Sequence, residues 1–225
     1  MSLILNIDTA TEKAQISLSR DAVILQALYN ESQNDHAAFL QPAISQLVKD
    51  TAISLNDIDA VAVTAGPGSY TGLRVGMASA KGLCYALQKP LIALNTLEVL
   101  AASALSIPSY HSIDLFCPMI DARRMEVYMG LYNRELEIVL SPATLELKTN
   151  SLEEQLLNNR IIFFGSGANK WQGICKSINV SFAAVTIMPG SMASLAEKSF
   201  YRKDFSALAY CEPIYLKEFQ TGRNK

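Results

Sequence analysis

Two short polar segments contain the residue types that hold a nucleotide phosphate. Asp8, Thr9 and Thr11 follow the first apolar run, where a carboxylate and two hydroxyls could bind a phosphate together with its metal ion. Gly165 and Gly167 follow a later apolar run and could face a ligand across a cleft. Hydrogen bonds that an aspartate accepts from its own turn explain the first segment equally well, and the second segment has no acidic residue. We therefore predict at most a vestigial nucleotide site at these positions.

The glycine-rich segment at residues 64–83, TAGPGSYTGLRVGMASAKGL, is a second place where an anion could bind. A strand that ends in the GPG motif at residues 66–68 and opens a helix would expose backbone N–H groups at the positive end of the helix dipole. The segment is not a Walker A loop, because Gly72 is followed by Leu73 and Arg74 rather than by lysine and a hydroxyl residue. A tight turn that needs glycine backbone angles explains the pattern as well.

Small residues recur on one face of the helix that follows. Gly72, Gly76 and Ala80 are spaced four apart, and each glycine lowers helix propensity by about 1 kcal/mol relative to alanine. Small side chains at this spacing allow another backbone to approach closely, so the stripe indicates either internal packing or an interface. The helix predicted before it has one apolar face, formed by Phe39, Leu40, Ala43, Ile44, Leu47 and Val48.

The remaining reactive side chains form no recognisable catalytic or metal-binding motif. His36 and His111 lie far apart, and neither has a second ligand at the spacing typical of metal sites. No serine or cysteine near either histidine matches a nucleophile motif. The four cysteines are widely spaced without a CxxC pair, which predicts buried thiols rather than disulfides or a zinc knuckle. These observations count against a hydrolase and predict no metal and no intrinsic cofactor.

The composition predicts a folded protein that spans no membrane. Of its 225 residues, 50% are hydrophobic and 18% are charged. The net charge of −2 lacks the basic excess of a chain that grips nucleic acid alone, so we expect any RNA to be held mostly by a partner. No apolar run reaches the roughly 18 residues that cross a bilayer, and the opening MSLILNIDTAT does not form a signal peptide. We therefore expect a cytoplasmic location.

The first half of the chain has the element order of a ribonuclease H-like fold. Three apolar or alternating runs predict a strand meander, after which strands alternate with helices. An antiparallel meander extended by parallel crossovers is the ribonuclease H-like topology. Pro42 must kink the first helix or lie in its first turns. The predicted strands are residues 3–7, 13–19, 23–29, 58–65 and 90–94, and the predicted helices are residues 35–49, 71–87 and 97–105.

The second half reads as a shortened copy of the first. Residues 115–120 and 125–132 predict a hairpin that turns around the DARR motif at residues 121–124. The last predicted helix is a candidate to pack back on the first lobe. Further predicted elements are a strand at residues 161–164 and helices at residues 168–177 and 193–202, and the two lobes are placed at residues 1–106 and 107–225.

Five motifs taken together closely resemble the bacterial TsaB (YeaZ) family across nearly the whole chain. The glycine block combined with DAR, EVY and a C-terminal EPIYL is specific, whereas each piece alone is weak. The resemblance implies an α/β protein with the actin-like ATPase fold, made of two ribonuclease H-like lobes of which the second is truncated. The motifs are NIDTAT at residues 6–11, GPGSYTGLRVGMASAKGL at 66–83, LNTLEVLA at 94–101, DARRMEVYMGLY at 121–132 and EPIYLK at 212–217.

The resemblance also implies a function in tRNA modification. TsaB proteins pair with their catalytic homologue TsaD and with the ATPase TsaE to place a threonylcarbamoyl group on adenosine 37 of tRNAs that read codons beginning with A. TsaD holds its metal with an HxxxH motif, and alignment on Glu98 puts Thr96 and Leu100 at the histidine positions. Neither side chain replaces an imidazole ligand, which implies a non-catalytic scaffold. Contact with tRNA is then expected to be indirect, with ATP or ADP bound weakly or at the junction of the complex.

The resemblance further implies that two helices form the TsaD interface as a helix bundle, and that the same surface forms a homodimer when TsaD is absent. Two alternatives stay open, which are an ATP-dependent enzyme or glycoprotease-like hydrolase of the same fold, and a self-assembling structural protein. The predicted interface residues are His36, Phe39, Leu40, Ala43, Ile44, Leu47, Tyr70, Gly72, Leu73, Gly76 and Ala80.

Overall fold

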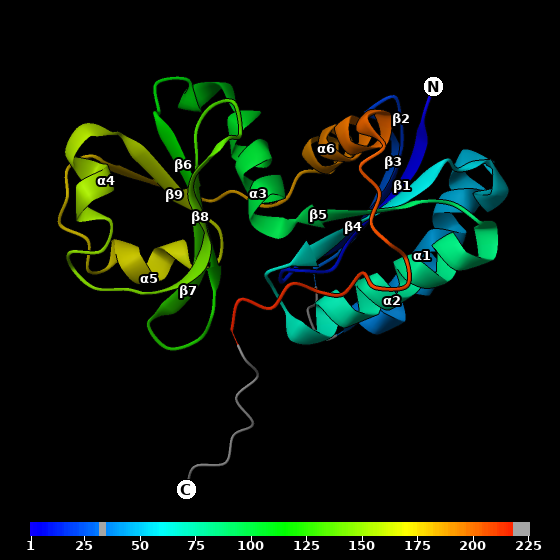
Figure 1. Cartoon of the computed structure of the whole chain (residues 1–225), viewed down its shortest axis with the longest axis horizontal. Coiled ribbons are helices and arrows are strands. Elements are labelled where there is room, and N and C mark those ends of the chain that lie inside the picture. Colours follow the sequence, from blue (N-terminus) through cyan, green and yellow to red (C-terminus); the bar gives the residue numbers. More distant parts are fainter. Residues whose placement is uncertain (32–34, 218–225) are drawn as a thin grey trace, which may run out of the picture.

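Two β-sheets, each covered by helices, lie beside one another in the structure (Figure 1). The computed structural model describes residues 1–31 and 35–217. Each sheet has five strands, in the orders β3-β2-β1-β4-β5 and β10-β9-β6-β7-β8. The two orders correspond strand for strand, because β6 takes the place of β1 and β9 takes the place of β4. The predicted α/β fold of two ribonuclease H-like lobes is therefore confirmed.

The first sheet combines an antiparallel meander with two parallel crossovers. Strand β1 pairs antiparallel with β2 and parallel with β4, so it lies at the centre of the sheet. All six residues of β1 are buried, as expected for a strand covered on both faces. The strands are β1 (Leu3–Asp8), β2 (Ala14–Arg20), β3 (Val23–Asn30), β4 (Ala60–Gly66) and β5 (Leu91–Asn95).

Helices α1 (His36–Thr51) and α2 (Tyr70–Leu87) cover one face of this sheet, where their apolar stripes pack on Leu5 and Ile7. Ile4 points to the opposite face, which α3 (Thr96–Leu105) and α6 (Pro189–Arg202) cover. Two short 3-10 helices, η2 (Leu55–Asp57) and η3 (Pro108–Tyr110), lie in connections. Pro42 lies in the second turn of α1, within the range predicted from the sequence.

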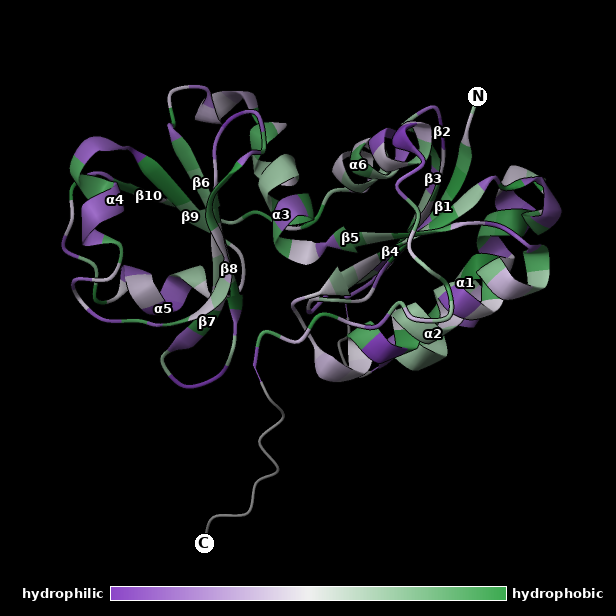
Figure 2. Cartoon of the chain, viewed as in Figure 1, coloured by the Kyte–Doolittle hydropathy of each residue, from purple (hydrophilic) through white to green (hydrophobic). Residues whose placement is uncertain are grey.

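The second sheet repeats the arrangement with shorter helices. Trp171 is fully buried on α5, where its ring meets Phe163 edge-on at a centroid distance of 4.5 Å. Hydrophobic residues concentrate in the central strands β6 and β9 (Figure 2). The elements are β6 (Leu115–Asp121), β7 (Glu126–Tyr132), β8 (Ile138–Glu146), α4 (Glu153–Asn158), β9 (Ile161–Phe164), α5 (Ala168–Gln172) and β10 (Val180–Ala183).

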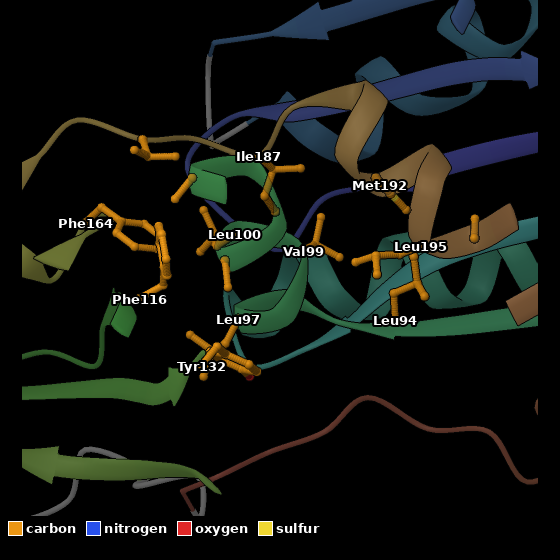
Figure 3. Packing of buried hydrophobic residues seen from close by; sticks show 14 of the residues in the cluster. Leu94, Leu97, Val99, Leu100, Phe116, Tyr132, Phe164, Ile187, Met192 and Leu195 are labelled. Carbon is orange, nitrogen blue, oxygen red and sulfur yellow. The ribbon is translucent and has the colours of Figure 1, made fainter. Parts of the chain in front are cut away.

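A shared apolar core joins the two lobes. Leu97 and Leu100 on α3 pack against Phe116 and Phe164 of the second sheet (Figure 3). The chain then returns to the first lobe, because α6 contacts β1, β3 and β5. Helix α3 therefore lies between the lobes, with one side on each sheet.

Three elements of the second lobe were absent from the sequence prediction. Strand β8 has an exposed, mixed composition that includes Pro142, and strand β10 has only four residues. Helix α4 has a single buried residue, Leu156, and so lacks a clear apolar period.

Two predicted helices of the second lobe have other boundaries in the structure. The helix predicted at residues 168–177 ends at Gln172, and the helix predicted at residues 193–202 begins earlier, at Pro189.

After α6, the chain crosses from the first lobe to the second as an extended segment, residues 203–217, which we call the C-terminal strap (Figure 1). Ser206 donates its backbone N–H to Leu91, Ile214 donates its backbone N–H to Ala65, and Lys81 Nζ donates to Cys211. In the part of the chain that the structure describes, no helix is long and apolar enough to cross a membrane.

Candidate functional site

A cavity of about 360 Å³ lies between the two lobes. The first lobe contributes the turn at residues 11–13, and helix α3 contributes Leu100. The second lobe contributes the turn at residues 165–166, two amide side chains of α5 and the extended residues 182–187. Two parts of the predicted nucleotide site, Thr11 and Gly165, thus face the same cavity.

Asp8 is buried in the first lobe, and its Oδ1 already accepts two hydrogen bonds. Its Oδ1 accepts hydrogen bonds from the Ala10 backbone N–H at 3.1 Å and from Thr64 Oγ1 at 2.8 Å. Burial raises the pKa of Asp8 to about 6, although these two bonds and the nearby His36 favour the charged form. The side chain therefore holds its own turn, as the alternative reading of the sequence had it, and does not line the cavity.

Thr9 is also committed to the interior of the first lobe. Its Oγ1 donates to the Gly72 carbonyl at 2.7 Å. A Cβ added at Gly72 would lie 2.0 Å from the Thr9 carbonyl oxygen, and one at Gly76 would lie 2.3 Å from Thr9 Oγ1. Gly72 and Gly76 of α2 therefore let the turn after β1 pack directly on the helix. At these two positions the small residues serve internal packing rather than an interface.

The turn after β9 repeats this close approach in the second lobe. Gly165 has a φ of +91°, which L-residues rarely adopt. It directly follows strand β9, which pairs with β6. Gly167 donates its N–H to the Met119 carbonyl at 2.9 Å, and a Cβ at Gly167 would meet Val127 at 2.7 Å. Both glycines thus serve backbone contacts with the central strand, and only Gly165 reaches the cavity.

The acidic residue that the sequence analysis missed in the second lobe comes from the β6–β7 hairpin. Asp121 ends β6 as Asp8 ends β1, and its backbone N–H donates to Ser166 Oγ at 3.1 Å. Its carboxylate accepts from the Arg123 backbone N–H and from Lys170 Nζ, both at 2.6 Å. The glycine segment itself contains no acid, as its sequence shows, but the fold brings Asp121 beside it. The signal was the position of the DARR motif at the end of a buried strand.

The two positions aligned with metal-binding histidines lie on α3 and are buried. The buried Oγ1 of Thr96 has no hydrogen-bond partner among the residues that the structure describes, and Leu100 lines the cavity. Burial raises the pKa of Glu98 between them, while Lys198 lowers it. Within residues 1–31 and 35–217, no three His, Cys, Asp or Glu side chains lie close enough to hold a metal ion.

The histidines and cysteines have structural surroundings. His36 is buried at the start of α1, with Nε2 3.0 Å from the Thr11 carbonyl oxygen, and His111 is exposed. Cys84 and Cys117 are buried free thiols, as predicted, whereas Cys175 and Cys211 are only partly buried.

Most residues predicted to form the partner interface are buried within the chain itself. Their periodicity is explained by packing on the first sheet, so a partner on these helices would touch the opposite, exposed side. Phe39 and Tyr70 are partly exposed. The buried members are His36, Leu40, Ala43, Ile44, Leu47, Gly72, Leu73, Gly76 and Ala80.

Comparison with known proteins gives consistent matches. The model of the TsaD family, described as tRNA N6-adenosine threonylcarbamoyltransferase, matches residues 29–156. The tRNA threonylcarbamoyladenosine biosynthesis protein TsaB of Escherichia coli is 29% identical over 226 aligned positions, which cover 95% of this chain and 94% of that protein. The TsaB protein of Bacillus subtilis is 36% identical over 129 positions, which cover 57% of this chain and about half (54%) of that relative.

Solved structures agree with the sequence matches. YeaZ from Pseudomonas aeruginosa is 26% identical, with a TM-score of 0.80, and the match covers 96% of this chain and 100% of that one. The ethanolamine utilization protein EutJ from Carboxydothermus hydrogenoformans has a TM-score of 0.52 at 9% identity, covering 86% of this chain and 90% of that one. The second likeness is one of fold alone.

Proposed function

Because the chain belongs to the TsaB (YeaZ) family, we propose that it takes part in the biosynthesis of threonylcarbamoyladenosine in tRNA as a non-catalytic subunit. The observation that carries the proposal is the state of the two candidate catalytic regions. Asp8 Oδ1 accepts from its own turn and from Thr64 of β4, and α3 presents Thr96 and Leu100 where a metal site would need imidazoles. The chain would therefore act through a catalytic partner, and we propose a cytoplasmic location on the ground of this role.

The proposed partner is a TsaD homologue, together with the ATPase TsaE, docked on the exposed side of α1 and α2. Gln41 Nε2 donates to Ser79 Oγ at 3.3 Å, which joins the two helices side by side. The exposed residues around this contact are mostly small or uncharged, and such residues allow a helix of another protein to approach closely. They include Ala37, Ala38, Ser45, Ala78, Gly82, Tyr85 and Ala86. Without TsaD, the same surface would form a homodimer.

We propose no intrinsic cofactor for the chain, and at most weak binding of ATP or ADP in the cavity or at the junction of the complex. The cavity offers hydroxyl and amide groups, and its cation Lys13 forms an ion pair with Glu31 at 2.7 Å. A phosphate chain would have to break that pair or find its cations on a partner.

The test is tRNA threonylcarbamoylation by purified TsaD and TsaE, supplied with ATP and threonylcarbamoyl-adenylate, with and without this chain. We expect modification to depend on the chain, and the chain alone to hydrolyse no ATP. If TsaD and TsaE are equally active without it, the scaffold proposal fails and the enzyme or the self-assembling structural protein takes its place. If the chain alone turns over ATP, the enzyme alternative is favoured.

The docking surface has its own matched test at Gly82. An added Cβ at Gly82 meets no atom within 4 Å, so Gly82→Glu places a charge on the exposed side of α2 without disturbing the core. Gly82→Ala is the control, because it changes the same position without adding charge. We expect the glutamate variant to lose TsaD binding in a pull-down and the alanine variant to keep it. Equal binding of TsaD by both variants would show that the interface does not include this side of α2.

A further inference from the structure

The β6–β7 hairpin turns through two adjacent arginines in an unusual conformation. Arg123 and Arg124 have φ values of +68° and +49°, a region that favours glycine or asparagine. The Asp121 carboxylate holds the turn by accepting the Arg123 N–H at 2.6 Å. Both side chains are exposed, and neither forms an ion pair with any residue that the structure describes. Arginine does not stabilise a turn with these backbone angles. We therefore look for a role of the two cations outside the turn.

A third arginine is held without a carboxylate at the start of α2. The Arg74 guanidinium lies 4.1 Å from the centre of the Tyr70 ring. Its Nε donates to the hydroxyl of Tyr215 on the C-terminal strap at 3.2 Å, and the two tyrosine rings are 5.3 Å apart. These contacts orient a cation and two aromatic rings at the surface.

The strap joins these two groups into one surface. Beyond Tyr215, the Leu216 carbonyl accepts from Thr144 Oγ1 at 3.1 Å, and Lys217 forms an ion pair with Glu126. Glu126 in turn donates its backbone N–H to the Arg123 carbonyl at 3.1 Å. The start of α2, the end of the strap and the β7 end of the hairpin accordingly lie together in Figure 1. We call the set Tyr70, Arg74, Arg123, Arg124, Tyr215 and Lys217 the basic face.

We propose that the basic face binds RNA. Three arginines without carboxylate partners suit the phosphates of an RNA backbone, and the tyrosine rings offer flat surfaces for a ribose or an unpaired base. The cations lie on both lobes, which suits an extended polyanion better than a single bound anion. The near-neutral net charge led us to expect that RNA is held mostly by a partner, but the C-terminal strap links the surroundings of three arginines that have no carboxylate partner. The choice of RNA over another polyanion rests on the proposed function.

Fluorescence anisotropy with labelled, unfractionated tRNA tests this inference on the full chain alone. The variant Arg123→Asn/Arg124→Gly removes two charges and installs residues that the turn prefers, so its Tm should equal or exceed that of the wild type. We expect its tRNA affinity at 0.1 M salt to fall on the order of tenfold, and the slope of log K against log salt to flatten by about 2. The matched control, Arg20→Gln/Arg202→Gln, removes two exposed charges elsewhere and should keep the wild-type affinity and slope.

Three results would overturn the inference. They are a wild-type chain that binds no tRNA at 50 µM protein and 0.05 M salt, an arginine variant that binds as the wild type does, and displacement of tRNA by polyglutamate at equal charge as effective as by unlabelled RNA. The last result would assign the face to an acidic protein. If the chain binds RNA but is dispensable for threonylcarbamoylation, the proposed function is refuted and the inference that the basic face binds RNA stands.

Discussion

Replacement of the three glycines of α2 by alanine should have three different effects on stability. At Gly82 the added Cβ meets no atom within 4 Å, so Gly82→Ala removes only the conformational cost of glycine and should stabilise by about 0.5–1 kcal/mol. At Gly76 the added Cβ would lie 2.3 Å from Thr9 Oγ1, and at Gly72 it would lie 2.0 Å from the Thr9 carbonyl oxygen. Both are far inside van der Waals distance.

The two clashes differ in how they can relax. Overpacking typically costs about 1–3 kcal/mol, and the gain in helix propensity offsets roughly 1 kcal/mol of this. At Gly76 the obstacle is a side-chain hydroxyl, which can rotate if it gives up its 2.7 Å hydrogen bond to the Gly72 carbonyl. At Gly72 the obstacle is backbone at the end of the central strand, which cannot move alone. We therefore expect Gly76→Ala to destabilise by about 1 kcal/mol and Gly72→Ala by about 2 kcal/mol or more.

Thr9→Ala separates these mechanisms, because it deletes Oγ1 and leaves the carbonyl in place. In thermal melts followed by circular dichroism, about 1 kcal/mol corresponds to roughly 2–4 °C in Tm for a protein of this size. Combined with Thr9→Ala, the Gly76→Ala substitution should cost less than it does in the wild type, whereas the cost of Gly72→Ala should not change. Equal relief of both, or a Gly72→Ala chain as stable as Gly82→Ala, would refute the packing argument.

Three further predictions concern other parts of the structure. The folded-state pKa of Asp8, about 6, lies above its ordinary value of 3.8, so the folded chain holds this proton more tightly and Asp8 opposes folding increasingly as pH rises through this window. Asp8→Asn should therefore gain stability over the wild type between pH 4 and pH 7.5, by up to roughly 3 kcal/mol in comparative melts, and a pH-independent difference would contradict this. Asn95 caps α3, because its side chain accepts hydrogen bonds from the backbone N–H groups of Leu97 at 2.9 Å and Glu98 at 3.3 Å. Asn95→Ala should therefore lower Tm by about 2–4 °C in calorimetry, and an unchanged Tm would count against the cap. Trp171→Ala should cost about 3–5 kcal/mol in urea titrations and abolish the near-ultraviolet dichroism of the buried ring, whereas a loss below about 1 kcal/mol would mean that the second core does not depend on it.

The sequence by itself determined the strands and helices whose residues share one simple environment. Strand β1 is buried on both faces and reads as an apolar run interrupted only by Asn6, while α1 and α2 show the apolar spacing of helices that cover a sheet. The edge strand β8 escaped prediction, because its order comes from pairing with β7 rather than from its own composition.

Tertiary structure alone decided what those patterns are used for. The spacing of Gly72 and Gly76 shows that something approaches closely, but only the fold shows that it is Thr9 of the same chain. In the same way, the hydrophobic period of α1 marks a buried face without saying what buries it.

The distribution of charge also depends on the tertiary structure. Composition determined that the chain is nearly neutral, whereas the position of each charge was set by folding. Arg74 and Arg124 lie far apart in the sequence, and the C-terminal strap connects their surroundings through Tyr215 and Lys217. Local periodicity reports only on neighbours within a few residues, whereas contacts between distant segments depend on the packing of the whole chain.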